Sequence, residues 1–417
     1  MNNRAVSRAH HNELFGENNM VVREKKRILA TYELEPQQEA IERAADLLLH
    51  EMTSGIQYYS TRTGSVMDRV RDHVPRVDPS VAGEVVSITK GEGGLYTVVF
   101  SLPAANVDPL LGGITNLWPV VAGEVFNFYF IKRSRLVDLD LPASFERRYL
   151  GPRLGIAGLR DLVGVMKGPL FGSIIKPNVG LNPAQASKLA RNLAEAGFDF
   201  VKDDEICVNP EICPLKERVR GIADALDAVE QKAGRRMLYM ANITCDFAML
   251  HEAASMALEA GAGGFMIDPF CTGLSSIDYL RRTFARPIYV HRVGYGLFTS
   301  GPAFSVSYEL FSKLFRLLGA DFSHVGGIWG GTSDARPKTQ RYLDILRGTK
   351  TGKPARLETW PVVSGISLES MEEYHGFYGD DTLFLEHIDI YRDSESARTK
   401  LAALKAHLAS VESGSAI

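Results

Sequence analysis

Eight short apolar runs, which recur along the chain from residue 168 onward, are the feature that most restricts its fold. The segments between them have helical periodicity, so each run is expected to begin a βα unit. Eight such units in roughly 230 residues are typical of a (β/α)8 TIM barrel. A doubly wound open sheet is the alternative, but the chain has no dinucleotide-binding glycine fingerprint. The expected strands are Phe171–Ile175, Phe198–Val201, Met237–Ala241, Gly264–Ile267, Pro287–Val290, Phe322–Val325, Trp360–Val363 and Thr382–Leu385.

The part before the barrel has a different pattern. Its strands and helices do not alternate strictly, which indicates a smaller α+β (ferredoxin-like) domain with an antiparallel sheet and helices on one side. The expected strands are Ile28–Leu34, Gly83–Ile88, Tyr96–Phe100 and Gly123–Ile131, with a helix over Gln37–Met52. We expect a flexible N-terminal arm (1–26), the α+β domain (27–145) and the barrel domain (146–417), with an outer amphipathic helix over Glu395–Val411.

Composition excludes several classes of function. A net charge of −3 gives no electrostatic reason to expect nucleic acid or an anionic membrane as a partner. No apolar run approaches the roughly 18 to 20 residues that span a bilayer, and the N-terminus has no apolar core of a secretion signal. The four cysteines form no C-x-x-C pair, so we expect reduced thiols in a cytoplasmic protein.

The stretch Val201-Lys202-Asp203-Asp204-Glu205 places a lysine and three carboxylates at the end of an expected buried strand. Burying such charges costs several kcal/mol per ion unless they are paired or hold a metal. Lys202 and Asp204 project to one side of the strand and Asp203 to the other, while Glu205 can turn back. Two carboxylates on one side can hold Mg²⁺. A solvated acidic loop with one ion pair is the alternative.

Polar residues also follow the other expected strands, and active sites of (β/α)8 barrels lie at these ends. So dense a set favours a functional site over chance. Asp268, before a proline, can also be only a helix cap, and His387 only a surface residue. The set comprises Lys176, Asn178, Lys202, Asp204, Glu205, Asn242, Asp268, His291, Arg292, His324, Ser364, Gly365, Glu386 and His387.

These residue types predict metal-assisted chemistry. A metal at Asp204 and Glu205 can polarise vicinal oxygens of a ketose or keto acid and stabilise an enediolate. A desolvated lysine beside a cation loses its proton readily, so Lys176 can act as general acid or base. His291 and His324 are expected to titrate near neutral pH and relay protons.

Two further features predict that the site takes an anion. Arg292 offers a planar fork for a carboxylate or phosphate. Ser364 and Gly365 can present a hydroxyl and a backbone N–H to an anion at a helix start.

At this point the chain resembles the ribulose bisphosphate carboxylase (RuBisCO) large-chain family. The matching motifs, in the family's order, are GSIIKPNVGL (172–181), GFDFVKDDE (197–205), VHR (290–292) and VSG (363–365). The first two are specific, and the resemblance covers residues from about 27 to 410. It implies an α+β domain followed by the barrel, and a head-to-tail dimer in which N-terminal residues complete the partner's site.

The resemblance implies roles for individual residues. Lys202 resembles the lysine that CO2 converts to a carbamate, and the carbamate, Asp204 and Glu205 would hold one Mg²⁺. Lys176 resembles the proton-transfer lysine, and His291 an active-site histidine. Arg292, His324 and Ser364 resemble the residues around one substrate phosphate, and Glu51 resembles the glutamate lent by the neighbouring subunit.

Several departures indicate that the chain does not fix CO2 and instead resembles the RuBisCO-like proteins (form IV). These proteins keep the metal and enolising centre without the carboxylation apparatus. Asn178 and Gly331 stand where carboxylases have lysines, and Glu124 stands where they have an asparagine. Ile56-Gln57 replaces Thr-Trp, and His387-Ile388 replaces the glycine pair at the second phosphate.

Members of that branch enolise or isomerise sugar phosphates, or decarboxylate keto sugar acids. With one anion site kept and the other remodelled, we expect Mg²⁺-dependent decarboxylation of a 3-oxo sugar acid or its monophosphate, of the 3-oxo-isoapionate-4-phosphate type. An enolase or isomerase of a ketose 1-phosphate in methionine salvage is the alternative. A non-catalytic binding or regulatory protein is the alternative of another class. The expected assembly is a homodimer or a dimer-based oligomer.

Overall fold

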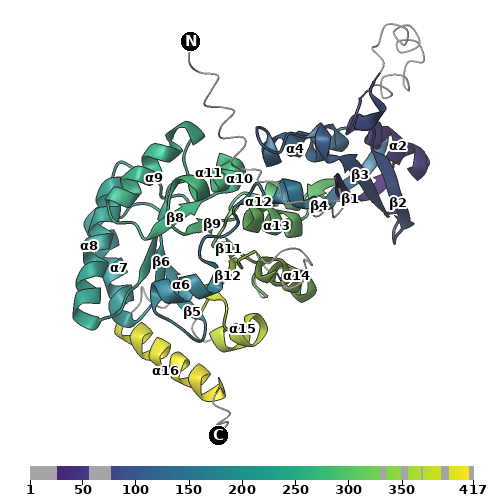
Figure 1. Cartoon of the computed structure of the whole chain (residues 1–417). Helices are drawn as coiled ribbons and strands as arrows, with labels where there is room; N and C mark the ends of the chain where they lie inside the picture. Colours follow the sequence, from purple (N-terminus) through teal and green to yellow (C-terminus); the bar gives the residue numbers. More distant parts are fainter. Residues whose placement is uncertain are drawn as a thin grey trace, which may run out of the picture.

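The computed structural model of the chain describes residues 26–55, 77–328, 335–348, 356–367, 370–386 and 394–412. Eight parallel strands close into a barrel in the order β11-β12-β13-β5-β6-β7-β8-β9 (Figure 1). Each predicted run overlaps one of these strands, so the predicted TIM barrel is confirmed. The strands are β5 Leu170–Ile174, β6 Phe200–Lys202, β7 Leu238–Asn242, β8 Gly264–Ile267, β9 Ile288–Val290, β11 Phe322–His324, β12 Trp360–Ile366 and β13 Leu383–Glu386.

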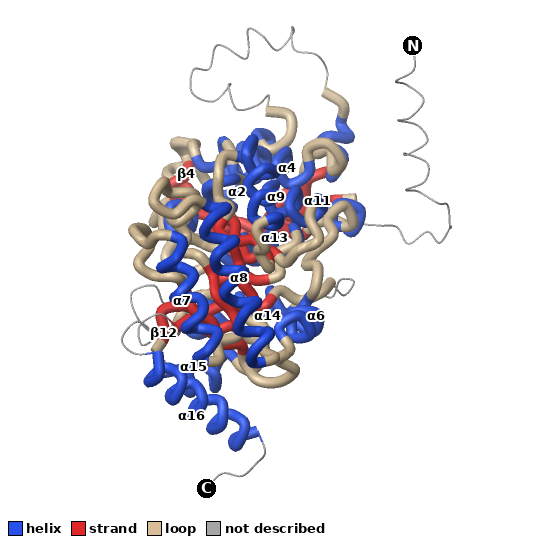
Figure 2. Tube along the Cα trace, turned by 90° about the vertical axis from the view of Figure 1, so that its left-hand side faces the viewer, coloured by secondary structure: helices blue, strands red, loops and turns tan. Residues whose placement is uncertain are grey.

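Helices connect the strands and cover the outside of the barrel (Figure 2). Helix α7 (Pro183–Ala196) shows how the sequence sets its ends. Asn182 and Gln185 form a capping box, and Gly197 ends the helix in the left-handed conformation that a side chain would strain. The others are α6 Gly155–Val163, α8 Leu215–Ala233, α9 Leu250–Glu259, α10 Pro269–Thr272, α11 Ser275–Thr283, α12 Tyr295–Thr299, α13 Tyr308–Leu318, α14 Arg336–Arg347, α15 Met371–Tyr378 and α16 Ser394–Glu412, with η6 Phe247–Met249. The predicted outer helix is confirmed as α16, which packs on α7.

The barrel interior is a packed core. Phe200 lies 5.8 Å from Tyr289 and 5.3 Å from Phe322, measured between ring centroids. Leu159 and Val163 of α6 belong to the same buried cluster, which also contains the first residue of β5. Apolar side chains therefore fill the barrel from its N-terminal end, and polar side chains gather where the strands end.

The N-terminal part contributes four strands to a five-stranded sheet in the order β10-β4-β1-β3-β2, which confirms the predicted α+β domain. Tyr32 of β1 donates to Val121 O at 2.5 Å and contacts Met52 Sδ, so α2 and α4 end on one face of the sheet. Strand β10 comes from the barrel part and pairs in parallel with β4, across the division proposed at residue 145. The elements are β1 Arg27–Pro36, α2 Ile41–Glu51, η3 Pro79–Val81, β2 Glu84–Lys90, β3 Tyr96–Pro103, η4 Ala104–Asn106, α4 Gly113–Ala122, η5 Glu124–Phe126, β4 Ile131–Asp140, α5 Ala143–Glu146 and β10 Phe304–Val306.

The strand predicted over Gly123–Ile131 is wrong. Residues Glu124–Phe126 form η5, a turn follows, and β4 begins at Ile131. Phe128 and Phe130 are buried and stack on each other, with centroids 5.0 Å apart, while Tyr129 between them is exposed. Alternation of this kind resembles a strand, but here it arises from the packing of a turn.

The predicted compartment was inferred from the cysteines and from the lack of long apolar segments, and the structure describes both features. All four cysteines are free. Within the described residues, no helix combines the length and the hydropathy that a bilayer crossing requires.

Candidate functional site

The strand ends bring seven predicted residues into one group, which we call the strand-end cluster. Its members come from β5, β6, β9 and β11 or from the residues that directly follow these strands, and all but Lys176 and Glu205 are buried. Ion pairs and ring contacts link them across the barrel mouth. The strand-end cluster comprises Lys176, Lys202, Asp204, Glu205, His291, Arg292 and His324.

Lys202 lies fully buried at the centre of this cluster. Its Nζ donates to Asp203 O at 3.0 Å and lies 3.6 Å from Glu205 Oε2. Burial lowers the pKa of Lys202, although Glu205 and Asp204 oppose the shift. The amine is therefore biased towards the neutral form, which is the form that can attack CO2.

Lys176 neutralises one of the two carboxylates. Its ammonium donates to Asp204 and, at 2.8 Å, to Asn178 Oδ1. Asp204 is 1% exposed, whereas the Lys176 side chain keeps 26% of its surface exposed at the mouth. Lys176 therefore holds a proton beside the carboxylate pair while remaining accessible to a substrate.

A second network, which the sequence analysis did not predict, holds the neighbouring carboxylate of Asp203 in place. Arg218 of α8 donates to both oxygens of Asp203 at 3.2 Å, and both side chains are 1% exposed. Tyr239 and the backbone N–H of Asn242 also donate to Asp203. Asp203 thus points away from Lys202, as predicted from the strand geometry. The sequence feature that could have revealed this network is Arg218, an arginine on the apolar face of α8.

Asn242 ties this network to the carboxylate pair. Its Nδ2 donates to the backbone carbonyls of Asp204 and Glu205, at 3.0 and 2.8 Å. Buried hydrogen bonds of this kind fix the loop after β6 before any ligand binds. The geometry of the pair is therefore preorganised by β7.

The expectation that His291 and His324 titrate near neutral pH is wrong. Burial, followed by the nearby cations, lowers the pKa of each well below 6.5. Both imidazoles are neutral at pH 7. The backbone N–H of Val293 donates to His291 Nδ1 at 3.1 Å, so the proton of this ring sits on Nε2, 3.7 Å from Glu205 Oε2.

Asp268 is a helix cap, as its alternative reading predicted. Its Oδ1 accepts from Phe270 N at 3.0 Å at the start of α10. Burial raises the pKa of Asp268 to about 7, and the charge of Glu205 adds to this shift. The carboxyl group therefore exchanges a proton near neutral pH at the edge of the cluster.

Arg292 and the Ser364–Gly365 pair, which were predicted to bind an anion, lie on different elements: Arg292 follows β9, and the pair lies in β12. The Arg292 guanidinium lies 4.5 Å from the Tyr295 ring centroid and 5.5 Å from that of Tyr308, which fixes its plane. The expected helix start at Ser364 is wrong, because both residues lie inside β12 and α15 begins only at Met371. The strand bulges there, and Gly365 has φ +78°, which favours glycine.

Glu51 lies at the end of α2, which packs on the strands of the N-terminal sheet. Burial, followed by the charge of Glu124, raises the pKa of Glu51. The chain thus gathers two carboxylates on this domain, and within the described residues no hydrogen bond or ion pair joins Glu51 to the strand-end cluster of the same subunit. Its predicted role requires a second subunit and stays a prediction.

Other predicted positions lie outside the described residues. These are Ile56 and Gln57, Gly331, His387 and Ile388. Glu386, directly before them, is fully buried at the end of β13.

The donor set fits a hard cation only in combination with Lys202. In the described part of the chain no three His, Cys, Asp or Glu side chains are arranged to hold a metal ion. Asp204 and Glu205 supply two carboxylates, and Mg²⁺ prefers oxygen ligands. Carbamylation would convert the buried Lys202 into a third oxygen donor. The residues present therefore fit Mg²⁺, provided that Lys202 is modified.

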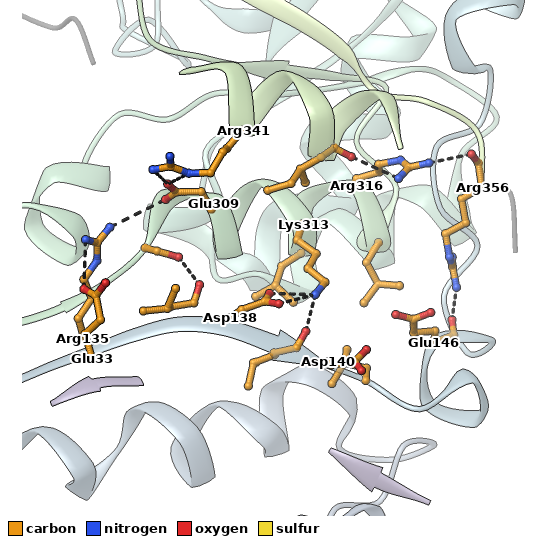
Figure 3. A pocket seen from close by; sticks show the side chains of 17 residues that line it. Glu33, Arg135, Asp138, Asp140, Glu146, Glu309, Lys313, Arg316, Arg341 and Arg356 are labelled. Carbon is orange, nitrogen blue, oxygen red and sulfur yellow. Dashed lines mark hydrogen bonds and ion pairs between the residues drawn. The ribbon is translucent and has the colours of Figure 1, made fainter. Parts of the chain in front are cut away.

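A separate cavity of about 740 Å³ lies between the N-terminal sheet and helices α13 and α14 (Figure 3). We call it the sheet–barrel cavity. Its lining contains five cations and five carboxylates, and several of them pair: Arg341 with Glu309 at 3.0 Å and Lys313 with Asp138 at 2.9 Å. Arg316 donates to backbone carbonyls. Because its charges are balanced, this cavity is a weaker candidate for a catalytic site than the strand ends.

Comparisons with known proteins agree with the motifs. Residues 155–356 match the family model described as ribulose bisphosphate carboxylase large chain, catalytic domain. A 3-oxo-isoapionate-4-phosphate transcarboxylase/hydrolase of Xanthobacter autotrophicus is 32% identical over 315 residues, which are 74% of this chain and 75% of that protein. A 3-oxo-isoapionate-4-phosphate decarboxylase of Rhizobium rhizogenes is 31% identical over 246 residues, 58% of each chain.

Solved structures support the same assignment. The octameric RuBisCO of Pyrococcus horikoshii superposes with a TM-score of 0.83 at 25% identity, covering 96% of this chain and 90% of that one. A rubisco-like protein of Burkholderia fungorum gives a TM-score of 0.78 at 28% identity, with 94% and 95% covered. The chain belongs to the ribulose bisphosphate carboxylase large-chain family, and its relatives include RuBisCO-like proteins.

Proposed function

We propose that the strand-end cluster catalyses Mg²⁺-dependent enolate chemistry on a sugar acid, most specifically the decarboxylation of a 3-oxo sugar acid monophosphate. The observation that carries this proposal is the buried Lys202 beside Asp204 and Glu205. An amine with a lowered pKa next to two carboxylates is costly unless it serves a function. The names of the Xanthobacter and Rhizobium relatives support a 3-oxo sugar acid phosphate as the class of substrate.

The roles follow from the contacts. When bound at Asp204, Glu205 and carbamylated Lys202, Mg²⁺ would supply positive charge that stabilises an enediolate. Breaking the bond between the carboxyl carbon and its neighbour releases CO2 and leaves the electron pair on that neighbouring carbon. Lys176 would donate the proton there, and its accessible ammonium, held against Asp204, supports this role.

The anion side supports a substrate with one phosphate or carboxylate at that end. The Arg292 guanidinium lies close to the rings of Tyr295 and Tyr308, and these contacts restrain its fork. At the end of β13 the carboxyl group of Glu386 is fully buried. A carboxylate there disfavours a second phosphate through like-charge repulsion.

Carboxyl transfer or hydrolysis is a second candidate, which the Xanthobacter relative's name favours. Carboxyl transfer can begin with the same cleavage as decarboxylation, but the carboxyl group is then joined to another carbon instead of leaving as CO2. Hydrolysis would follow by attack of water on a carbonyl carbon, which breaks the adjoining carbon–carbon bond. We further propose a cytoplasmic homodimer, or an oligomer built from dimers, with Glu51 reaching the partner's site.

Incubation with 3-oxo sugar acids and their monophosphates, in the presence of Mg²⁺ and bicarbonate, tests the proposal. We expect CO2 release, accompanied by incorporation of solvent deuterium in D2O observed by NMR, and loss of both in Lys176→Ala. A carboxylated or hydrolysed product without free CO2 would favour the second candidate. Exchange or isomerisation without CO2 release would instead indicate an enolase or isomerase, and silence despite confirmed Mg²⁺ binding would contradict all three.

A further inference from the structure

Tyr289 is a buried polar residue that the proposed reaction leaves unused. It lies in β9, two residues before His291, and is fully buried inside the barrel. Its ring packs against Phe200 and lies 5.8 Å from Lys202 Nζ. A phenol in an apolar core needs a hydrogen-bond partner, because an unmade bond there costs free energy.

That partner is His324. The Tyr289 hydroxyl forms a hydrogen bond with His324 Nε2, and the two rings meet edge to face with centroids 5.3 Å apart. Among the described residues, His324 Nε2 is the only hydrogen-bond partner of this hydroxyl. The phenolic proton therefore has one acceptor, and the bond runs from Tyr289 O–H to Nε2.

This direction fixes the position of the imidazole proton. A phenol keeps its proton at neutral pH, and an imidazole whose Nε2 accepts that proton's hydrogen bond is neutral. A neutral imidazole carries one proton, and with Nε2 accepting that proton is on Nδ1. His324 Nδ1 has no hydrogen-bond partner within the described part of the chain. Tyr308 donates to His324 O at 2.8 Å and holds the backbone of this residue.

We propose that Tyr289 is a positioning residue that holds His324 as its Nδ1–H tautomer, so that the imidazole offers only a hydrogen-bond donor to a bound ligand. His291 carries its proton on the opposite nitrogen, Nε2, although the two rings lie only 4.6 Å apart. A donor-only imidazole beside Arg292 selects an anion and rejects groups that must donate. The inference deepens the proposed function by assigning the selectivity of its anion side.

The test begins with the free protein, without Mg²⁺ or substrate. Nitrogen-15 NMR of histidine-labelled protein reports which ring nitrogen carries the proton, and His324 is assigned by the signal lost in His324→Gln. We expect protonated Nδ1 in the natural protein and a shift of the proton towards Nε2 in Tyr289→Phe. Protonated Nε2 in the natural protein would overturn the proposal even if the variant fails to fold. An unchanged tautomer in folded Tyr289→Phe would also overturn it.

Tyr239→Phe is the matched control, because Tyr239 is an equally buried barrel tyrosine whose hydroxyl bonds Asp203 instead of a histidine. It should leave the His324 tautomer unchanged. Titration with inorganic phosphate then measures the consequence. Loss of one donor should weaken phosphate binding by up to about tenfold in Tyr289→Phe. Because NMR reports the His324 tautomer without turnover, the outcome of this test does not depend on the decarboxylase activity.

Discussion

The strand-end cluster and the sheet–barrel cavity are both rich in charged side chains, yet the pairing and the burial of these charges differ between the two regions. In the sheet–barrel cavity, cations meet carboxylates or backbone carbonyls, as Arg341 meets Glu309 and Arg316 meets Leu357 O. In the strand-end cluster, two lysines, an arginine and two neutral histidines surround two carboxylates, and burial lowers the pKa of Lys202. The comparison teaches that unbalanced, desolvated charge marks a candidate site better than cavity volume does.

The largest expected effect comes from Lys202. Lys202→Ala removes the third oxygen donor, so activity that depends on Mg²⁺ and bicarbonate should fall about 1,000-fold or more, a loss of ~4 kcal/mol in transition-state stabilisation. Steady-state kinetics on the substrate that the proposed screen identifies provide the measurement. Lys313→Met in the sheet–barrel cavity is the control and should change activity by no more than about twofold. Equal losses in both variants would abolish the distinction between the two regions.

A buried and an exposed ion pair should differ in their contribution to stability. Arg218→Met leaves Asp203 buried without its cation, so the free energy of unfolding should fall by ~3–5 kcal/mol. Arg341→Gln breaks a pair in which Arg341 is 55% exposed, and should cost ~0–1 kcal/mol. Urea denaturation followed by circular dichroism measures both. Similar costs would show that burial does not separate the two regions.

Acid should destabilise the fold through the strand-end histidines. The folded pKa values of His291 and His324 lie well below the unfolded value of about 6.5. Their contribution to stability is therefore present above pH 6.5 and is lost as the pH falls towards the folded values, by about 1.4 kcal/mol per pH unit for each residue. His324→Gln should reduce this slope between pH 6.5 and 5. His251→Gln, at an exposed position, should leave it unchanged.

The smallest predicted effect concerns competition for Asp204. Lys176→Gln removes the ammonium that pairs with this carboxylate, so Mg²⁺ should bind more tightly by ~1 kcal/mol, or about fivefold. Calorimetric titration with Mg²⁺ in bicarbonate measures this affinity. Lys188→Gln makes the same change of charge at an exposed position on α7 and should have no effect. Weaker binding in Lys176→Gln would mean that Lys176 supports the metal site.

Strands could be predicted from the sequence where a local pattern of apolar residues determines them. Runs such as Gly264–Ile267 became strands with the bounds expected, because a buried parallel strand is apolar on both faces. The strand prediction for Gly123–Ile131 was wrong because its alternating aromatic residues match the strand pattern although they pack in a turn. The strand-end rule then located most of the candidate site, because a barrel always brings its strand ends together.

The barrel, the α+β domain, the family and the residues at the barrel mouth could all be inferred from sequence patterns. How those residues behave depends on the folded structure. It showed that Arg218 anchors Asp203, that Tyr289 meets His324, and that both histidines are neutral. The physical reason is that burial and hydrogen-bond partners come from strands and helices far apart in the chain, and these non-local contacts set pKa values and tautomers.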